Sequence, residues 1–226
     1  MNKTILTTLV LVFISGCASN QWQTKLEAYP GMYDERQPLT MVVVPAINTT
    51  TAANASNYFN VTITEPLANQ GYYPMPVEIV RDIFLKEGIV DSTMIKGLPL
   101  SMFKENFGAD AVLFVTIERW DTTYAVLAAN VSVGLEYVLL STETNEILWQ
   151  YSSTIVVDTT AQSSGFIVAD IINTAITTAT TDYVPIAKNV NAQAFIALPH
   201  GTYSKKHRTD MDENVVFQAL KDAATD

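Results

Sequence analysis

The stretch Ala111-Val112-Leu113-Phe114-Val115-Thr116-Ile117 is the most apolar run of the chain after residue 16. It is rich in β-branched residues and shows no alternation with polar ones. Such a run is typical of a strand that is buried on both faces of a sheet. We therefore expect residues 111–117 to form the central strand, and we expect the flanking segments to supply its neighbours and its cover.

The segments before this strand alternate between strand and helix patterns. A β-branched run at 39–45 predicts a second buried strand, which Pro45 ends, and the small polar residues 46–56 predict a loop. A short strand is expected at 72–76. Helices are predicted at 57–70, at 77–87 and from Pro99 to 107, and they are followed by Gly71, Gly88 and Gly108. This βαβ-like order favours parallel strands with right-handed crossovers.

The second half of the chain has a different pattern. Residues 122–140 alternate between apolar and polar, 141–145 resemble a turn, and 146–157 resume a strand, which predicts an antiparallel hairpin. Helices are expected at 165–182, at 185–196 and at 212–224. The sequence therefore predicts a mixed α/β fold, in which a central sheet of parallel and antiparallel strands is covered by helices in a single domain at 38–226.

The single cysteine, Cys17, directly follows an apolar segment at 4–14 that is too short to span a membrane and has Lys3 before it. Residues 1–16 with Cys17 resemble a bacterial lipoprotein signal. This resemblance implies cleavage between Gly16 and Cys17 and acylation of Cys17. Residues 17–37 are interpreted as a lipidated tether whose aromatic residues dock on the domain. By this resemblance, Ala18 and Ser19, in place of aspartate, favour the outer membrane. The sequence leaves both faces of that membrane open, and the periplasmic face is preferred to the cell surface.

The acidic charge argues against binding to nucleic acid and to anionic lipid, and the single cysteine rules out a disulfide within the chain. Cleavage removes one of the 13 basic residues and none of the 23 acidic ones, which leaves a formal charge of −11. Nucleic-acid binding depends on neutralising phosphates with Lys and Arg, so an acidic domain argues against it. The acidic balance also argues against adsorption to anionic lipid headgroups. With Cys17 acylated, no disulfide is available within the chain.

No catalytic motif or metal-binding spacing is found, and no cofactor is expected. His200 and His207 are expected to be solvated loop residues, and Asp210, Asp212 and Glu213 are expected to cap the last helix. Two alternative functions stay open. One is a small-molecule or glycan-binding protein that uses an aromatic platform of Tyr72, Tyr73, Trp120 and Tyr124. The other is a hydrolase in which His200 works with an Asp or Glu.

Several motifs together resemble a known family, namely bacterial lipoproteins of unknown function typified by a meningococcal genome-derived vaccine-candidate antigen. They are Cys17 with its preceding residues, 41–45, 108–113, 139–149 and 198–203. Thr202 stands where the family usually has proline. The resemblance implies a fold like the amino-terminal domain of TolB and like curli-secretion-type lipoproteins. It also implies a non-enzymatic accessory or assembly subunit of an outer-membrane complex, with protein partners and a homodimer as one expected assembly.

Overall fold

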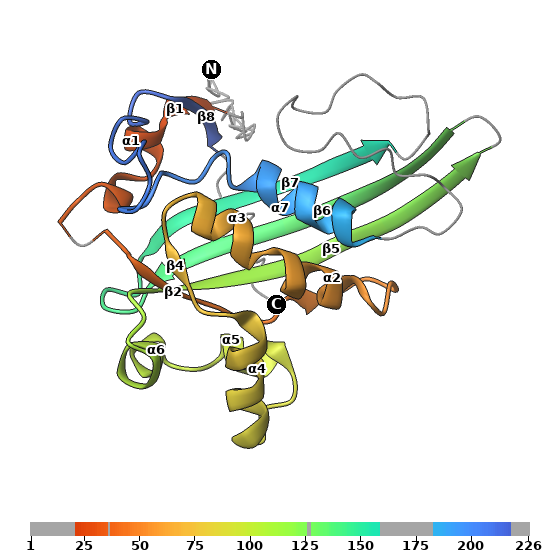
Figure 1. The fold of residues 1–226 in the computed structure, drawn as a ribbon, viewed down its shortest axis with the longest axis horizontal. Helices are drawn as coiled ribbons and strands as arrows, with labels where there is room; N and C mark the ends of the chain where they lie inside the picture. The colour runs from red at the N-terminus through yellow and green to blue at the C-terminus, as the bar shows by residue number, and fades with distance from the viewer. Residues whose placement is uncertain (1–20, 36, 126–127, 159–182, 218–226) are drawn as a thin grey trace, which may run out of the picture.

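A six-stranded sheet forms the centre of the computed structural model, which describes residues 21–35, 37–125, 128–158 and 183–217 (Figure 1). Its strand order is β4–β2–β5–β6–β7, and β3 also pairs with β5. The strands are β2 (Thr40–Val43), β3 (Ile47–Asn48), β4 (Tyr73–Pro74), β5 (Ala111–Ala125), β6 (Ala128–Ser141) and β7 (Ile147–Asp158).

The sheet is mixed, as the sequence predicts. β2 runs parallel to both β4 and β5, whereas β5, β6 and β7 are antiparallel neighbours. β5 is the central strand, and it continues well beyond the expected end at Ile117. A register shift between Ile117 and Arg119 reverses the alternation of side chains, so that Trp120 is buried and Arg119 is exposed. The shift explains why the sequence pattern changes at this point.

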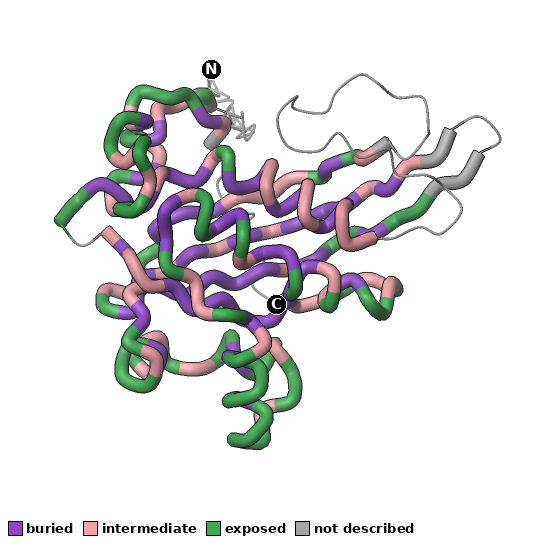
Figure 2. Tube along the Cα trace, in the orientation of Figure 1, coloured by how far each residue is buried: buried purple, intermediate pink, exposed green. Residues whose placement is uncertain are grey.

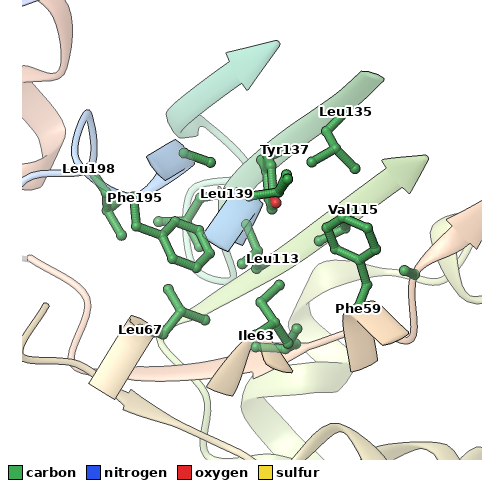
Figure 3. Close-up of a cluster of buried hydrophobic side chains, with 14 of the residues drawn as sticks. Phe59, Ile63, Leu67, Leu113, Val115, Leu135, Tyr137, Leu139, Phe195 and Leu198 are labelled. Atoms are coloured by element: carbon green, nitrogen blue, oxygen red, sulfur yellow. The ribbon is translucent and has the colours of Figure 1, made fainter. Parts of the chain in front are cut away.

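Helices cover both faces of the sheet. One face packs against α2 (Ala55–Thr62), α3 (Thr64–Asn69) and α7 (Val184–Ala194). Figure 3 shows Phe59, Ile63 and Leu67 on this helical side, opposite Leu113, Tyr137 and Leu139 of the strands. Each large side chain that is fully buried here stabilises the fold by roughly 1.5–3 kcal/mol.

The opposite face carries a smaller apolar cluster. There α4 (Val77–Lys86), α5 (Ser92–Lys96) and α6 (Leu100–Phe107) cover part of β2 and β5. Phe84 and Phe103 pack together above Val112, and Figure 2 shows the buried segments running along the strands between the two helical layers. Gly108 ends α6 in the left-handed conformation, as predicted from its position.

Several expected elements differ in the structure. The helix expected at 57–70 is divided into α2 and α3 at Ile63, because Pro66 has no N–H to donate to the carbonyl of Thr62. The loop expected at 46–56 contains β3, and α5, which begins after its cap Asp91, was not expected. The helix predicted at 185–196 is present as α7, whereas the helix predicted at 165–182 lies outside the described residues.

Both ends of the described chain meet in a second, two-stranded sheet. β1 (Gln21–Thr24) pairs antiparallel with β8 (Asn214–Phe217). The helix predicted from 212 is therefore wrong at these positions, because pairing with β1 overrides the local preference. α1 (Lys25–Ala28) and η1 (Pro30–Met32) follow β1, so residues 21–33 of the expected tether are folded. Tyr29 and Tyr33 dock on the domain as expected, whereas Trp22 is exposed.

Candidate functional site

A buried polar cluster lies where the N-terminal segment meets the loop at 198–213. We call Lys25, Tyr33, Tyr72, His200 and Asp210 the terminal clasp. In Figure 1 this loop wraps around α1 and the β1–β8 pair. A capping box starts α1, because the Thr24 hydroxyl accepts from the N–H of Glu27 and the Glu27 carboxylate accepts from the N–H of Thr24. The cap fixes the first turn of α1, in which Lys25 is buried.

A buried ion pair is at the centre of the terminal clasp. Nζ of Lys25 lies 3.3 Å from Oδ2 of Asp210, and the two side chains are 3% and 0% exposed. The same ammonium lies 2.9 Å from a carboxylate oxygen of Glu213, which is half exposed. The backbone N–H of His200 also donates to Oδ2 of Asp210, at 2.9 Å. Because burying a charge is costly unless it is paired and hydrogen-bonded, these contacts offset the cost of burying Lys25 and Asp210.

The terminal clasp also contains two buried tyrosines, Tyr33 and Tyr72. Burial raises the pKa of Tyr33 far above its ordinary value, and the negative charge of Asp210 adds to this effect. Burial also raises the pKa of Tyr72, with smaller contributions from Tyr33 and Asp210. The Tyr72 hydroxyl donates a 2.6 Å hydrogen bond to the carbonyl of Pro199. Both phenols therefore stay neutral, and Tyr72 acts as a fixed donor that holds the loop.

Two glycines let the loop at 198–213 approach the end of α3. Gly71 has φ +93°, and its carbonyl accepts from the N–H of Tyr203 at 3.1 Å. The N–H of Gly201 donates to the carbonyl of Gln70 at 2.9 Å. A Cβ atom at Gly71 would overlap the backbone of Ser204, and one at Gly201 would overlap the carbonyl of Gly71. Glycine is therefore required on both sides of this contact.

His200 has contacts that differ from the solvated position expected for it. Its Nδ1 lies 3.1 Å from the hydroxyl of Ser204, and the ring is half-buried. Burial lowers the pKa of His200, and the charges of Lys25 and Lys206 add to this, against the opposing charge of Asp210. The Asp210 carboxylate, however, bonds the backbone N–H of His200. In a catalytic triad, a carboxylate accepts a hydrogen bond from the imidazole ring and orients it. Asp210 instead accepts from the backbone of His200, so this arrangement is not that of a triad.

The remaining candidates also differ from expectation. His207 is half-buried, with Nδ1 3.3 Å from the carbonyl of His200, and Asp210 is an ion-pair partner rather than a helix cap. Within the described ranges, no group of three His, Cys, Asp or Glu side chains is placed to hold a metal ion. In the same ranges, no helix has the length and apolar character needed to cross a bilayer. Gly16 and Cys17 lie outside them.

The structure does not bring the four proposed platform aromatics together. Tyr72 is buried in the terminal clasp, and Tyr73 is 61% exposed on the edge strand β4. Trp120 is in the core against Tyr58. Tyr73 pairs with Thr40 beside the start of β5, so Trp120 lies nine residues further along that strand, a distance of about 30 Å. The side chain of Tyr124 lies outside the described part of the structure.

A family model described as "Putative lipoprotein GNA1162-like" matches residues 29–202. The chain belongs to this lipoprotein family. The resemblance of its motifs to the meningococcal antigen family is therefore confirmed. Within the terminal clasp, Tyr33, Tyr72 and His200 lie inside the matched residues, whereas Lys25 and Asp210 lie outside them.

Individual GNA1162-like relatives agree with this assignment. The chain is 26% identical over 135 residues to the protein NMB1124/NMB1162 of Neisseria meningitidis serogroup B, a match that spans 60% of this chain and 63% of that protein. The crystal structure of lipoprotein GNA1162 from Neisseria meningitidis has a TM-score of 0.50 at 26% identity, over 54% of this chain and 84% of that one. The mixed α/β fold is thus confirmed. A PelC dodecamer structure from Paraburkholderia phytofirmans has a TM-score of 0.47 at 13% identity, over 79% of this chain and 94% of that one.

The terminal clasp is the feature that sequence reasoning missed. Lys25 and Asp210 belong to common residue types in polar segments 185 residues apart, and no motif links them. The sequence feature that pointed toward this region was the segment 198–203, one of the motifs that resemble the family.

Proposed function

We propose that the protein is a lipid-anchored, non-catalytic accessory subunit of a complex at the outer membrane, with its domain on the periplasmic face. Membership in a lipoprotein family supports the anchor, and Cys17 is the residue available for acylation. Ala18 and Ser19, which take the place of an aspartate retention signal, favour the outer membrane.

The observation that carries this proposal is the short connection between Cys17 and the folded domain. Three residues separate Cys17 from β1, and β1 is fastened to the domain by β8 and by the buried pair of Lys25 and Asp210. Acyl chains on Cys17 would hold the whole domain beside the bilayer. Oδ2 of Asp210 binds both the ammonium of Lys25 and the backbone N–H of His200, and the Tyr72 hydroxyl binds the carbonyl of Pro199. These contacts fasten the loop at 198–213 to the N-terminal segment, which suits a structural role better than a catalytic one.

The anchor is tested by mass spectrometry of the chain purified from membranes. We expect acyl chains on Cys17 and their loss in Cys17→Ser, with the variant released from the membrane fraction. An unmodified Cys17 in membrane-purified protein would contradict the anchor. Stable attachment needs more than one chain, so two or more acyl groups are expected.

The accessory role is tested by cross-linking in the native envelope. Ile79 and Ile83 lie one turn apart on α4 and are exposed despite being apolar, so they are suitable positions for a photoreactive residue. Glu105, exposed on α6, is the matched control. We expect discrete protein adducts from the α4 positions and few from Glu105. A monomer that forms no adducts at any of these positions would contradict the accessory role. A glycan-binding platform has no support from its described residues, because Tyr72 and Trp120 are buried and Tyr73 is exposed far from Trp120.

A further inference from the structure

One tryptophan of the chain is exposed beside the anchor. Trp22 on β1 is 72% exposed, whereas Trp120 and Trp149 are 7% and 0% exposed in the core. Leu26, four residues further on in α1, is also exposed. A large aromatic side chain that remains in water after folding gives up the free energy that burial would contribute. Its exposure at this end of the molecule therefore points to a partner.

A basic loop lies at the same end of the domain. Lys205, Lys206 and Arg208 stand within four residues, with no acidic side chain from 201 to 209, in a chain whose formal charge is −10. Lys205 and Lys206 are exposed, and neither forms an ion pair with any described residue. Arg208 donates to the carbonyl of Tyr33 at 3.0 Å, which ties the loop to the N-terminal segment. Figure 1 shows this loop beside β1 and α1.

The length of the chain limits how far this surface can be from the bilayer. Trp22 is five residues after Cys17, so their Cα atoms are at most about 18 Å apart. Tryptophan is enriched at the membrane–water interface, where its ring is apolar and its N–H is polar. Lysines near a bilayer are attracted to anionic headgroups, even when the protein as a whole is acidic.

We propose that the end of the domain formed by β1 and the loop at 203–208 lies flat on the lipid surface, with Trp22 in the interface and Lys205 and Lys206 against anionic headgroups. This orientation rests on the acylation of Cys17 in the proposed function. Of the acidic side chains at this end, Glu27 accepts from the N–H of Thr24 and Glu213 pairs with Lys25, whereas Lys205 and Lys206 form no ion pair with a described residue. The attraction of these two lysines to the headgroups therefore favours this orientation.

Trp22 is itself the probe for this orientation, because the other two tryptophans are buried. The acylated full-length mature protein is placed in vesicles of phosphatidylglycerol mixed with phosphatidylcholine. We expect the emission of Trp22 to shift to shorter wavelength, to lose most of its quenching by acrylamide, and to be quenched by brominated lipid. Trp22→Phe should abolish all three effects and leave the fluorescence of Trp120 and Trp149.

The lysines are tested in the same vesicles. Each charge near an anionic surface contributes a factor of about five, so the variant K205Q/K206Q should lower the equilibrium constant for docking roughly 25-fold. The matched control K86Q/K96Q removes two exposed lysines from α4 and α5 and should leave the quenching unchanged.

The outcomes separate this inference from the proposed function. Protein that carries acyl chains but whose Trp22 is quenched by acrylamide in vesicles as strongly as in the non-acylated Cys17→Ser variant in solution overturns the orientation and leaves the anchor intact. Absence of acyl chains overturns the proposed function instead. Shielding of Trp22 in native membranes but not in pure lipid vesicles also overturns the lipid contact, because a protein would then cover Trp22.

Discussion

Replacing Lys25 by methionine tests whether the terminal clasp holds the N-terminal segment to the domain. Lys25→Met keeps the length of the side chain and removes its charge, which leaves the fully buried Asp210 without its ammonium partner. Breaking a buried pair on one side costs about 3–5 kcal/mol. The total free energy of unfolding of a domain is about 5–15 kcal/mol, so the loss is a large share of it.

The assay is urea unfolding of residues 18–226, followed by circular dichroism, with the melting temperature as a second readout. We expect the midpoint to fall at an unchanged slope and the melting temperature to fall by about 10 °C. Asp210→Asn should cost less, because Lys25 keeps Glu213 at 2.9 Å and the amide oxygen can still accept from His200. The double variant should be more stable than the sum of the two single changes predicts, by about 2 kcal/mol.

Lys188→Met is the matched control. Lys188 lies 2.8 Å from a carboxylate oxygen of Glu65, but both side chains are exposed, so its loss should change the free energy of unfolding by less than about 1 kcal/mol. The reasoning is refuted if Lys25→Met destabilises no more than Lys188→Met, or if the two single changes are simply additive in the double variant.

Three further predictions concern other joints of the fold. Burial disfavours the charged form of Asp110, but the ammonium of Lys104 and the N–H groups of Thr40 and Leu39 outweigh it and lower the pKa. The ionised Asp110 carboxylate therefore stabilises the fold fully at a pH above the ordinary pKa of 3.8, and this stabilisation is lost as the pH falls through the lowered pKa. In Asp110→Asn, the urea midpoint should therefore fall less steeply as the pH is lowered. Gly71→Ala should destabilise the domain by more than Gly88→Ala in urea unfolding, because both glycines have positive φ but only Gly71 has backbone atoms in the way of a Cβ; equal losses would contradict the close contact with the loop. Tyr137→Phe should cost about 1–3 kcal/mol in the same assay, since it leaves the buried Oδ1 of Asn191 without its 2.7 Å donor, and a neutral effect would mean that Asn191 finds another partner.

The parts of the fold that could be predicted are those in which local pattern and burial agree. The apolar run at 111–117 and the alternation before Leu140 identify β5 and β6, because strands inside a sheet impose these patterns on their own residues. The sequence pattern treated 122–140 as one strand, whereas residues up to Ala125 belong to β5 and residues from Ala128 belong to β6, because the residues on both sides alternate in the same way. β8 was predicted as a helix, since its partner β1 lies almost the whole chain away and contributes nothing to a local pattern.

The candidate site was less predictable than the fold. The aromatic platform assumed that strand-end tyrosines and tryptophans meet, but β5 is long enough to separate them. The contacts of the terminal clasp depend on which polar residues are buried, and that is decided only when the loop at 198–213 docks on Gly71. In the sequence, Lys25 cannot be told from a surface lysine, and only the three-dimensional structure shows that it is buried.

The pairing of β1 with β8 also sets the order in which the molecule is completed. Gln21 is synthesised 196 residues before its partner Phe217. Contacts between residues this distant in sequence form late, because the intervening chain must first be brought together. The N-terminal strand is thus among the last elements to be secured, and a polypeptide that stalls before β8 would leave β1 with no strand to pair with.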